Sequence, residues 1–131
     1  MVDQTIKSHR DLIAWKKAID LTVDVYRVTK AFPSDERFGL TSQIRRASSS
    51  VPANITEGQG RRLKREFVQF LSYARGSLLE LDSHLVLALR LEYIDKLNFS
   101  GLSEQVDEVG RIINGLVRSL TSDLQHLTSD L

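Results

Sequence analysis

The sequence predicts an all-α protein, a single antiparallel four-helix bundle of up-down-up-down topology. Three observations predict it: apolar residues recur at spacings of three and four in four segments, no segment alternates as a strand does, and the breaks between segments are short. The 131 residues suffice for one domain with one core. We therefore interpret residues 1–131 as one bundle, with an N-terminal arm over 1–9 and a frayed C-terminal end over 125–131.

The first helix is expected over residues 11–32. Its apolar stripe has core spacing and consists of Leu12, Trp15, Ile19, Thr22, Tyr26 and Thr29. The stripe is widened by Ala18, Val25 and Val28. The helix should stop at Phe32, because the residue before a proline is disfavoured in the α conformation.

The second helix is expected to follow Ser34, a good N-cap, and to carry its core face on Leu40, Ile44, Ala47, Val51 and Ile55. Pro52 lies inside this pattern and removes the hydrogen bond to the carbonyl of Ser48. We expect a kink at residues 48–50, whose serine hydroxyls can bond freed carbonyls, rather than a break. Gly58 and Gly60 are expected to end the helix as C-cap and turn residues.

The third helix, over residues 63–93, is the longest helical pattern. Its main face comprises Phe67, Phe70, Leu71, Ala74, Leu78, Leu81, Leu85, Ala88 and Leu91. Further apolar residues lie outside that face, so we expect this helix to be buried on two sides, within the bundle or in an oligomer interface.

A loop over 95–101 should lead to the fourth helix, with Ser103 as a candidate N-cap. Its core face comprises Leu102, Val106, Val109, Ile113, Leu116, Leu120, Leu124 and Leu127.

Composition excludes several classes of protein. There is no cysteine, so disulfides, thiolate metal sites and cysteine nucleophiles are excluded. Met1 is followed by VDQTIKSHRD, which has no apolar h-region, so we expect no secretory signal. The longest uncharged apolar run, Leu85–Leu89, is too short to span a bilayer. We expect a soluble cytoplasmic protein with no membrane partner.

Charge is segregated along the chain although the net charge is only +1. Residues 37–75 carry eight basic and two acidic side chains, whereas residues 76–131 carry four basic and nine acidic ones. The candidate nucleic-acid-binding residues lie in the basic segment: Arg45, Arg46, Arg61, Arg62, Lys64 and Arg65. Arginine makes bidentate contacts with phosphate, and backbone amides at a helix start add to them. The alternative is a solvated loop with salt bridges to Glu104, Asp107 and Glu108.

Other candidates favour structural roles. Arg46, Asn54 and Glu57 are expected to form a polar network around Pro52. His84 follows Glu80 by four residues, but the paired Glu-x-x-His motifs of a bundle metal site are absent, so we predict no metal and no cofactor.

No histidine or lysine is placed by the sequence to activate the serines at 48–50, so we expect no enzyme. The aromatic residues Trp15, Tyr26, Phe67, Phe70 and Tyr73 have core spacing and favour packing over base stacking.

Three stretches resemble one family: DLIAWKKAIDL, VYRVTKAFPSDERFGLTSQIRRASSSVPANITEGQGR and EFVQFLSYARGSLLELDSHL. Together they resemble the small bacterial four-helix-bundle proteins encoded in intervening sequences of large-subunit ribosomal RNA genes. The accessory protein of diversity-generating retroelements is a related branch. The resemblance covers about residues 11–93. Two positions depart from the pattern, Leu63 where Ser or Thr often caps the third helix, and Thr56 in place of the usual Ala.

The resemblance implies a homopentameric ring with a basic surface that meets nucleic acid and a reverse transcriptase. We therefore expect a non-enzymatic, oligomeric nucleic-acid-binding or ribonucleoprotein accessory module that contacts phosphate without reading sequence. The alternative is a protein–protein interaction scaffold with no nucleic-acid role. In that case the apolar third helix and acidic fourth helix bind a protein, and the basic residues act between subunits.

Overall fold

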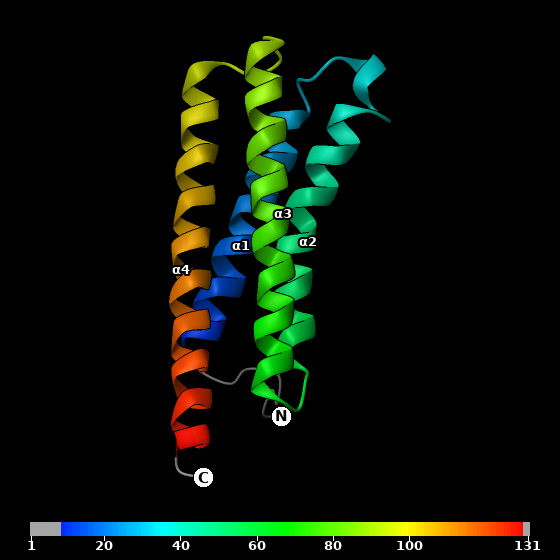
Figure 1. Cartoon of the computed structure of the whole chain (residues 1–131). Coiled ribbons are helices and arrows are strands. Elements are labelled where there is room, and N and C mark those ends of the chain that lie inside the picture. The colour runs from blue at the N-terminus through cyan, green and yellow to red at the C-terminus, as the bar shows by residue number, and fades with distance from the viewer. Residues whose placement is uncertain (1–8, 130–131) are drawn as a thin grey trace.

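The computed structural model describes residues 9–129, with side chains described for Asp11 and for residues 13–122. It contains four helices and a short 3₁₀ turn, and no strand within residues 9–129 (Figure 1). The elements are α1 (His9–Thr29), the 3₁₀ turn Ser34–Glu36, α2 (Leu40–Gln59), α3 (Lys64–Arg90) and α4 (Lys96–Ser129). The predicted all-α class and its four helices are confirmed. Residues 1–8 of the expected arm lie outside the described residues, and the expected fraying from residue 125 stays a prediction.

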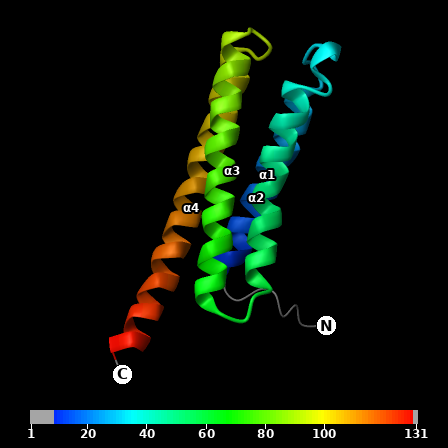
Figure 2. The same ribbon diagram turned by 45° about the vertical axis from the view of Figure 1, so that its right-hand side comes forward.

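Each helix packs against two others. Contacts join α1 with α2, α2 with α3, α3 with α4 and α4 with α1, whereas none joins α1 with α3 or α2 with α4 among the described residues. In cross-section α1 is therefore diagonal to α3, and α2 is diagonal to α4 (Figures 1 and 2). Short connections make successive helices antiparallel, so the α2–α3 turn and the α3–α4 connection lie at opposite ends. No helix in the described part of the chain has the length and apolarity needed to cross a membrane.

The core of α2 agrees with the sequence prediction, whereas that of α1 agrees only in part: Ala18, Val25 and Thr29 are buried as predicted. The buried apolar residues of α1 are Ala14, Ala18, Leu21 and Val25. The predicted stripe was therefore displaced by one position for most of its length, and Tyr26 is 42% exposed. Small alanines at the centre of the bundle allow neighbouring helices to approach closely. The bulky Trp15 and Ile19 are left only half-buried at the edge.

Glu36 organises the connection between α1 and α2. Its Oε1 accepts a hydrogen bond from the Leu40 N–H (3.2 Å), and its Oε2 accepts one from the Tyr93 hydroxyl (2.9 Å). The bond to Glu36 is the main cause of the raised pKa of Tyr93. The prediction of Ser34 as the N-cap of α2 is wrong: Ser34 begins a separate 3₁₀ turn, and the Glu36 carboxylate satisfies the first N–H of α2 instead.

The fourth helix begins earlier than predicted. Asp95 Oδ1 accepts a hydrogen bond from the Asn98 N–H (2.7 Å), which is an N-cap interaction. The Asp95 carbonyl also accepts the first helical bond, from Phe99 (2.9 Å). Residues 96–101 are therefore helix rather than loop, and Ser103 lies inside α4.

Pro52 lies inside α2 and is buried, yet the helix is continuous from Leu40 to Gln59. The proline leaves the carbonyl of Ser48 without its helical donor. That carbonyl accepts a hydrogen bond from Thr22 Oγ1 of α1 (3.0 Å), which also lies 2.9 Å from the Ala18 carbonyl. The serine hydroxyls that we expected to act here bond earlier carbonyls instead. The donor for the freed carbonyl thus comes from another helix.

Gly58 is a packing residue of α2 rather than its C-cap. It is buried, and a Cβ added there would lie 2.7 Å from Phe67 Cδ1 and 2.9 Å from Phe70 Cβ. The C-cap is Gly60, whose N–H bonds the Thr56 carbonyl in a right-handed conformation. Gly58 therefore fixes how closely α3 begins beside the end of α2.

We expect Gly58→Ala to lower the free energy of unfolding by about 1–3 kcal/mol, because the added methyl overpacks against Phe67 and Phe70. Gly101→Ala in α4 is the matched control. Nothing lies within 4 Å of its added Cβ, so it should raise stability by about 0.5–1 kcal/mol through helix propensity. Urea denaturation measures both, and stabilisation by Gly58→Ala would contradict the packing role.

We expect Thr22→Val to lower the free energy of unfolding by about 1–3 kcal/mol, the cost of a buried carbonyl without a donor. In a Pro52→Ala background the alanine N–H can bond the Ser48 carbonyl, so the same change should cost much less. Denaturation of the four chains of this double-mutant cycle measures the coupling. An equal cost in both backgrounds would show that Thr22 does not compensate for the proline.

Candidate functional site

Four of the six candidate cations surround the α2–α3 turn. We call Arg61, Arg62, Lys64 and Arg65 the cationic turn. Arg62, Lys64 and Arg65 are exposed, and neither arginine of these three forms an ion pair with any described residue. Arg61 differs, because its Nη2 lies 2.8 Å from Glu57 Oε1 and its guanidinium stacks 4.6 Å from the Phe70 ring centre. The turn thus presents three solvent-facing cations beside one that is held in place.

The N-terminus of α3 adds backbone donors to this turn. Leu63 occupies the N-cap position and supplies no side-chain acceptor, as its departure from the family pattern suggested. The first backbone bonds of α3 run from Glu66 and Phe67 to the Leu63 carbonyl. At the start of any helix, the amides that precede the first such bond point along the axis and have no acceptor within the helix. Cations at a helix N-terminus oppose the helix dipole. An anion bound there would be attracted by the cationic side chains and by the positive end of the dipole.

The other two candidates lie elsewhere. About fifteen residues of helix separate Arg46 from Arg61, which corresponds to about 22 Å. Arg45 is half-buried: its Nε donates to Thr29 Oγ1 (2.9 Å) and its guanidinium lies 4.7 Å from the Tyr26 ring centre. Arg46 is exposed and has no ion pair among the described residues. The six residues therefore do not form a single cluster; Arg45 joins α2 to α1, and Arg46 is isolated from the cationic turn.

The structure does not bring the predicted polar network together. Asn54 Nδ2 donates to the Ser50 carbonyl (2.8 Å), which is not the carbonyl that the proline frees. Glu57 pairs with Arg61, and Arg46 bonds neither of them in the described part of the chain. The hydroxyls of the three serines at 48–50 donate to backbone carbonyls one turn earlier. The bonds of Asn54 and of these serines therefore lie within α2, apart from a second contact of the Ser50 hydroxyl with that of Ser77 in α3.

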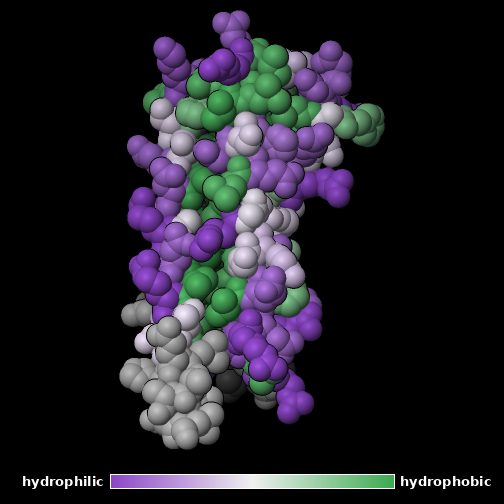
Figure 3. All heavy atoms as spheres, viewed as in Figure 1, coloured by the Kyte–Doolittle hydropathy of each residue, from purple (hydrophilic) through white to green (hydrophobic). Residues whose placement is uncertain are grey.

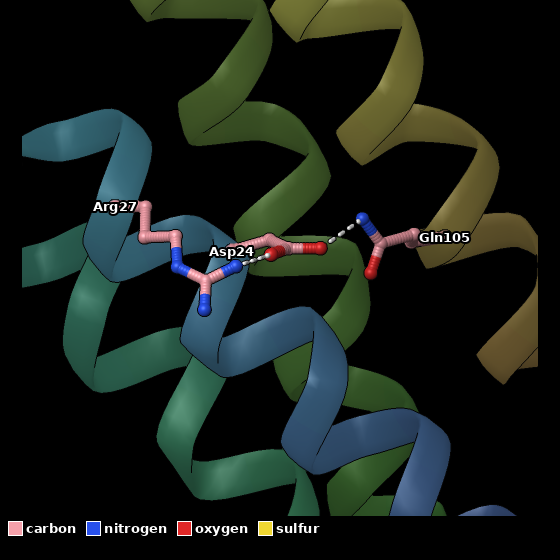
Figure 4. Close-up of polar contacts among 3 residues, drawn as sticks. All are labelled: Asp24, Arg27 and Gln105. Carbon is pink, nitrogen blue, oxygen red and sulfur yellow. Dashed lines mark hydrogen bonds and ion pairs between the residues drawn. The ribbon is translucent and has the colours of Figure 1, made fainter.

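Glu108 of α4 pairs with α1, and no arginine of the cationic turn pairs with a described acidic residue of α4. Lys17 Nζ lies 2.9 Å from Glu108 Oε1, and this hydrogen bond is the main cause of the raised pKa of Lys17. Asp24 accepts from Arg27 (3.2 Å) and from Gln105 (2.9 Å) in the same α1–α4 groove, as Figure 4 shows. The alternative, salt bridges from the basic residues to Glu104, Asp107 and Glu108, is therefore wrong for the candidate arginines in the described part of the chain.

The remaining sequence candidates are the histidine of α3 and the aromatic residues. His84 Nε2 lies 3.5 Å from Glu80 Oε1, and no group of three or more potential metal ligands occurs among the described residues. Among the aromatic residues, Phe67 is buried in the core as predicted, whereas Tyr26 and Tyr73 are 42% and 50% exposed. Core spacing therefore misplaced both tyrosines.

The solvent-facing surface of α3 carries several large apolar side chains. Leu79 is 70% exposed, and Val86 and Leu87 are also exposed. Figure 3 shows hydrophobic side chains along the front of the bundle, over α3 and its boundary with α4. The second buried side that the sequence predicts for this helix is thus not supplied by the described part of the chain.

Comparisons with known proteins place this arrangement in context. Residues 10–115 match the sequence profile of the 23S rRNA-intervening sequence protein family. A crystal structure from Bacteroides thetaiotaomicron, of a protein of unknown function from the S23 ribosomal protein family, superposes with a TM-score of 0.77. It is 22% identical, and the match covers 83% of this chain and 98% of that one.

No curated protein matches the chain. The structural likeness supports the bundle fold, and the profile match spans most of the sequence. The chain belongs to the 23S rRNA-intervening sequence protein family.

Proposed function

We propose that the protein is a non-enzymatic, homo-oligomeric module that contacts the phosphate backbone of nucleic acid through the cationic turn. The observation that carries this proposal is the exposure of Arg62, Lys64 and Arg65 around a helix start, with both arginines lacking an ion pair among the described residues. Guanidinium groups and helix-start amides both favour phosphate, and neither reads base identity there. Arg61 supports the site by packing on Phe70, whereas Arg45 is engaged with α1 and is not assigned to the site.

The resemblance to ring-forming relatives supports a homopentamer as the assembly. Within the proposed ring, each copy would contribute three exposed cations, so a nucleic acid following the ring meets a repeated positive surface. The alternative, a protein-binding scaffold without nucleic acid, is supported by the exposed apolar surface of α3. The two proposals differ in salt dependence, because phosphate contacts release counterions and apolar contacts do not.

We expect Arg62, Lys64 and Arg65 changed together to Gln to weaken binding of a labelled DNA duplex or single-stranded RNA and to flatten its salt dependence. On duplex DNA, the slope of log affinity against log salt should fall in magnitude by about 0.9 for each phosphate that the variant no longer neutralises. Sedimentation should show an unchanged particle mass. Fluorescence anisotropy across a salt series gives the slope.

The matched control removes three exposed cations at the opposite end of the bundle: Lys30, Arg90 and Lys96, each changed to Gln. Its overall charge equals that of the test variant, so non-specific attraction falls equally in both. Binding that weakens equally in both variants would contradict a phosphate site at the cationic turn. Absence of binding by the native chain at low salt would remove the nucleic-acid proposal and favour the scaffold.

A further inference from the structure

Two apolar surfaces lie on diagonal helices. The first, which we call the α1 face, comprises Trp15, Ile19, Val23 and Tyr26, spaced by four, four and three residues. Val23 and Tyr26 are exposed, although Arg45 stacks on one side of the Tyr26 ring, whereas Trp15 and Ile19 are half-buried and expose only their outer parts. The second, the α3 face, comprises Tyr73, Leu79, Val86 and Leu87. Because α1 and α3 make no contact with each other, these faces point away from opposite sides of the bundle.

Each face lies beside a shallow hollow. On the α1 face there is a shallow hollow of about 340 Å³, lined by Ile13, Trp15 and Ile19 with charged neighbours. On the α3 face Tyr73 and Leu79 protrude, being 50% and 70% exposed. Between them lies Gly76, where nothing would lie within 4 Å of an added Cβ. A hollow of the same volume, about 340 Å³, borders Leu79 on the side of α4, so both faces combine a shallow hollow with exposed apolar side chains.

Contacts within the bundle give the relative heights of α1 and α3. Thr22 bonds the Ser48 carbonyl, and the Ser50 hydroxyl contacts that of Ser77. At about 1.5 Å rise per residue, Leu79 then lies at about the height of Thr22. Two copies side by side in the same orientation would thus bring Leu79 of one close to Val23 of the other.

Charges beside the two faces are complementary in that arrangement. Asp20 and Arg27 line the α1–α4 groove, and Arg75 and Asp82 line the α3–α4 groove, so all four flank their faces on the side of α4. By the same heights, Asp20 lies about 3 Å above Arg75, and Arg27 lies about 3 Å above Asp82. One small shift along the axis therefore aligns both pairs of opposite charge.

We propose that the α1 face of one copy binds the α3 face of a second copy, with Asp20 opposite Arg75 and Arg27 opposite Asp82. The inference rests on the homo-oligomer of the proposed function and names the surfaces that form it. Such an interface is heterologous, because different surfaces of the two copies meet. It forms a closed ring when the rotations between successive copies add up to a full turn. All copies then have the same orientation.

The test uses one broken face per variant. Val23→Glu places a charge on the α1 face and Leu79→Glu places one on the α3 face; Leu97→Glu, at an 83% exposed position on neither face, is the control. Circular dichroism establishes that each variant is folded. By sedimentation velocity, the two face variants alone should have the monomer mass of 14.8 kDa, whereas the control keeps the native mass.

Mixing the two face variants is decisive. Each retains the face that the other lacks, so the mixture should form dimers and nothing larger. A mixture that stays monomeric would overturn the heterologous interface, because the intact α3 face of one variant and the intact α1 face of the other would have failed to bind. A native mass for Leu79→Glu would overturn the inference while leaving the proposed oligomer intact, and a monomeric native chain would overturn both.

Charge reversal provides a second set of variants at exposed positions, which leaves the apolar faces unchanged. Arg75→Asp should weaken self-association at low salt, and the double change Arg75→Asp with Asp20→Arg should restore it. Failure of the double variant to recover would contradict the pairing of these two residues. Nucleic-acid binding, followed in parallel, distinguishes loss of assembly from loss of the phosphate site.

Discussion

The continuity of α2 through a buried proline is the constraint on which the rest of the structure depends. The proline removes a donor from the carbonyl of Ser48, and a buried carbonyl without a partner would favour a break in the helix. Thr22 of α1 supplies the donor from outside the helix. The α1–α2 pair is thereby held at one height, and α2 continues far enough to bring the cationic turn to the end of the bundle opposite the α3–α4 connection.

Close packing then determines what the bundle leaves exposed. Alanines of α1 and Gly58 of α2 occupy positions where neighbouring helices approach closely, so larger residues such as Val23 and Tyr26 lie on the outer side of α1. A monomer gains nothing from apolar groups on that side. Close packing of small residues inside the bundle thus leaves apolar side chains on its surface, where a second copy can bind them.

The fold followed from apolar periodicity, since spacings of three and four identify helices even when their ends are uncertain. The ends themselves were missed where a cap is not a local pattern: Glu36 caps α2 from inside the preceding turn, and Asp95 starts α4 in a stretch that has the composition of a loop. Periodicity also placed the core of α1 one position away, because apolar residues occur on more than one side of that helix. Spacing alone cannot choose between adjacent apolar stripes.

For the candidate site, charge counting along the sequence grouped residues that the helix separates. Arg45 and Arg46 are near the start of α2 and the cationic turn follows its end, so the length of the helix keeps them apart. Stacking of arginine on an aromatic ring was also invisible in the sequence, since the partners Tyr26 and Phe70 are identified only by packing. All three arginines carry the same charge, but Arg62 and Arg65 are exposed, whereas Arg45 is half-buried and bonded to α1.

The two proposals are connected by the orientation of the copies. A symmetric dimer with its axis across the bundle would direct the cationic turns of the two copies to opposite ends. Parallel copies joined α1 face to α3 face would direct every cationic turn to the same end. Screening limits the addition of their fields to about 8–10 Å at physiological salt, so each turn acts mainly on the phosphates nearest to it. A flexible nucleic acid passing along that end of a ring would therefore gain by contacting successive turns, each weak alone, through their effective concentration.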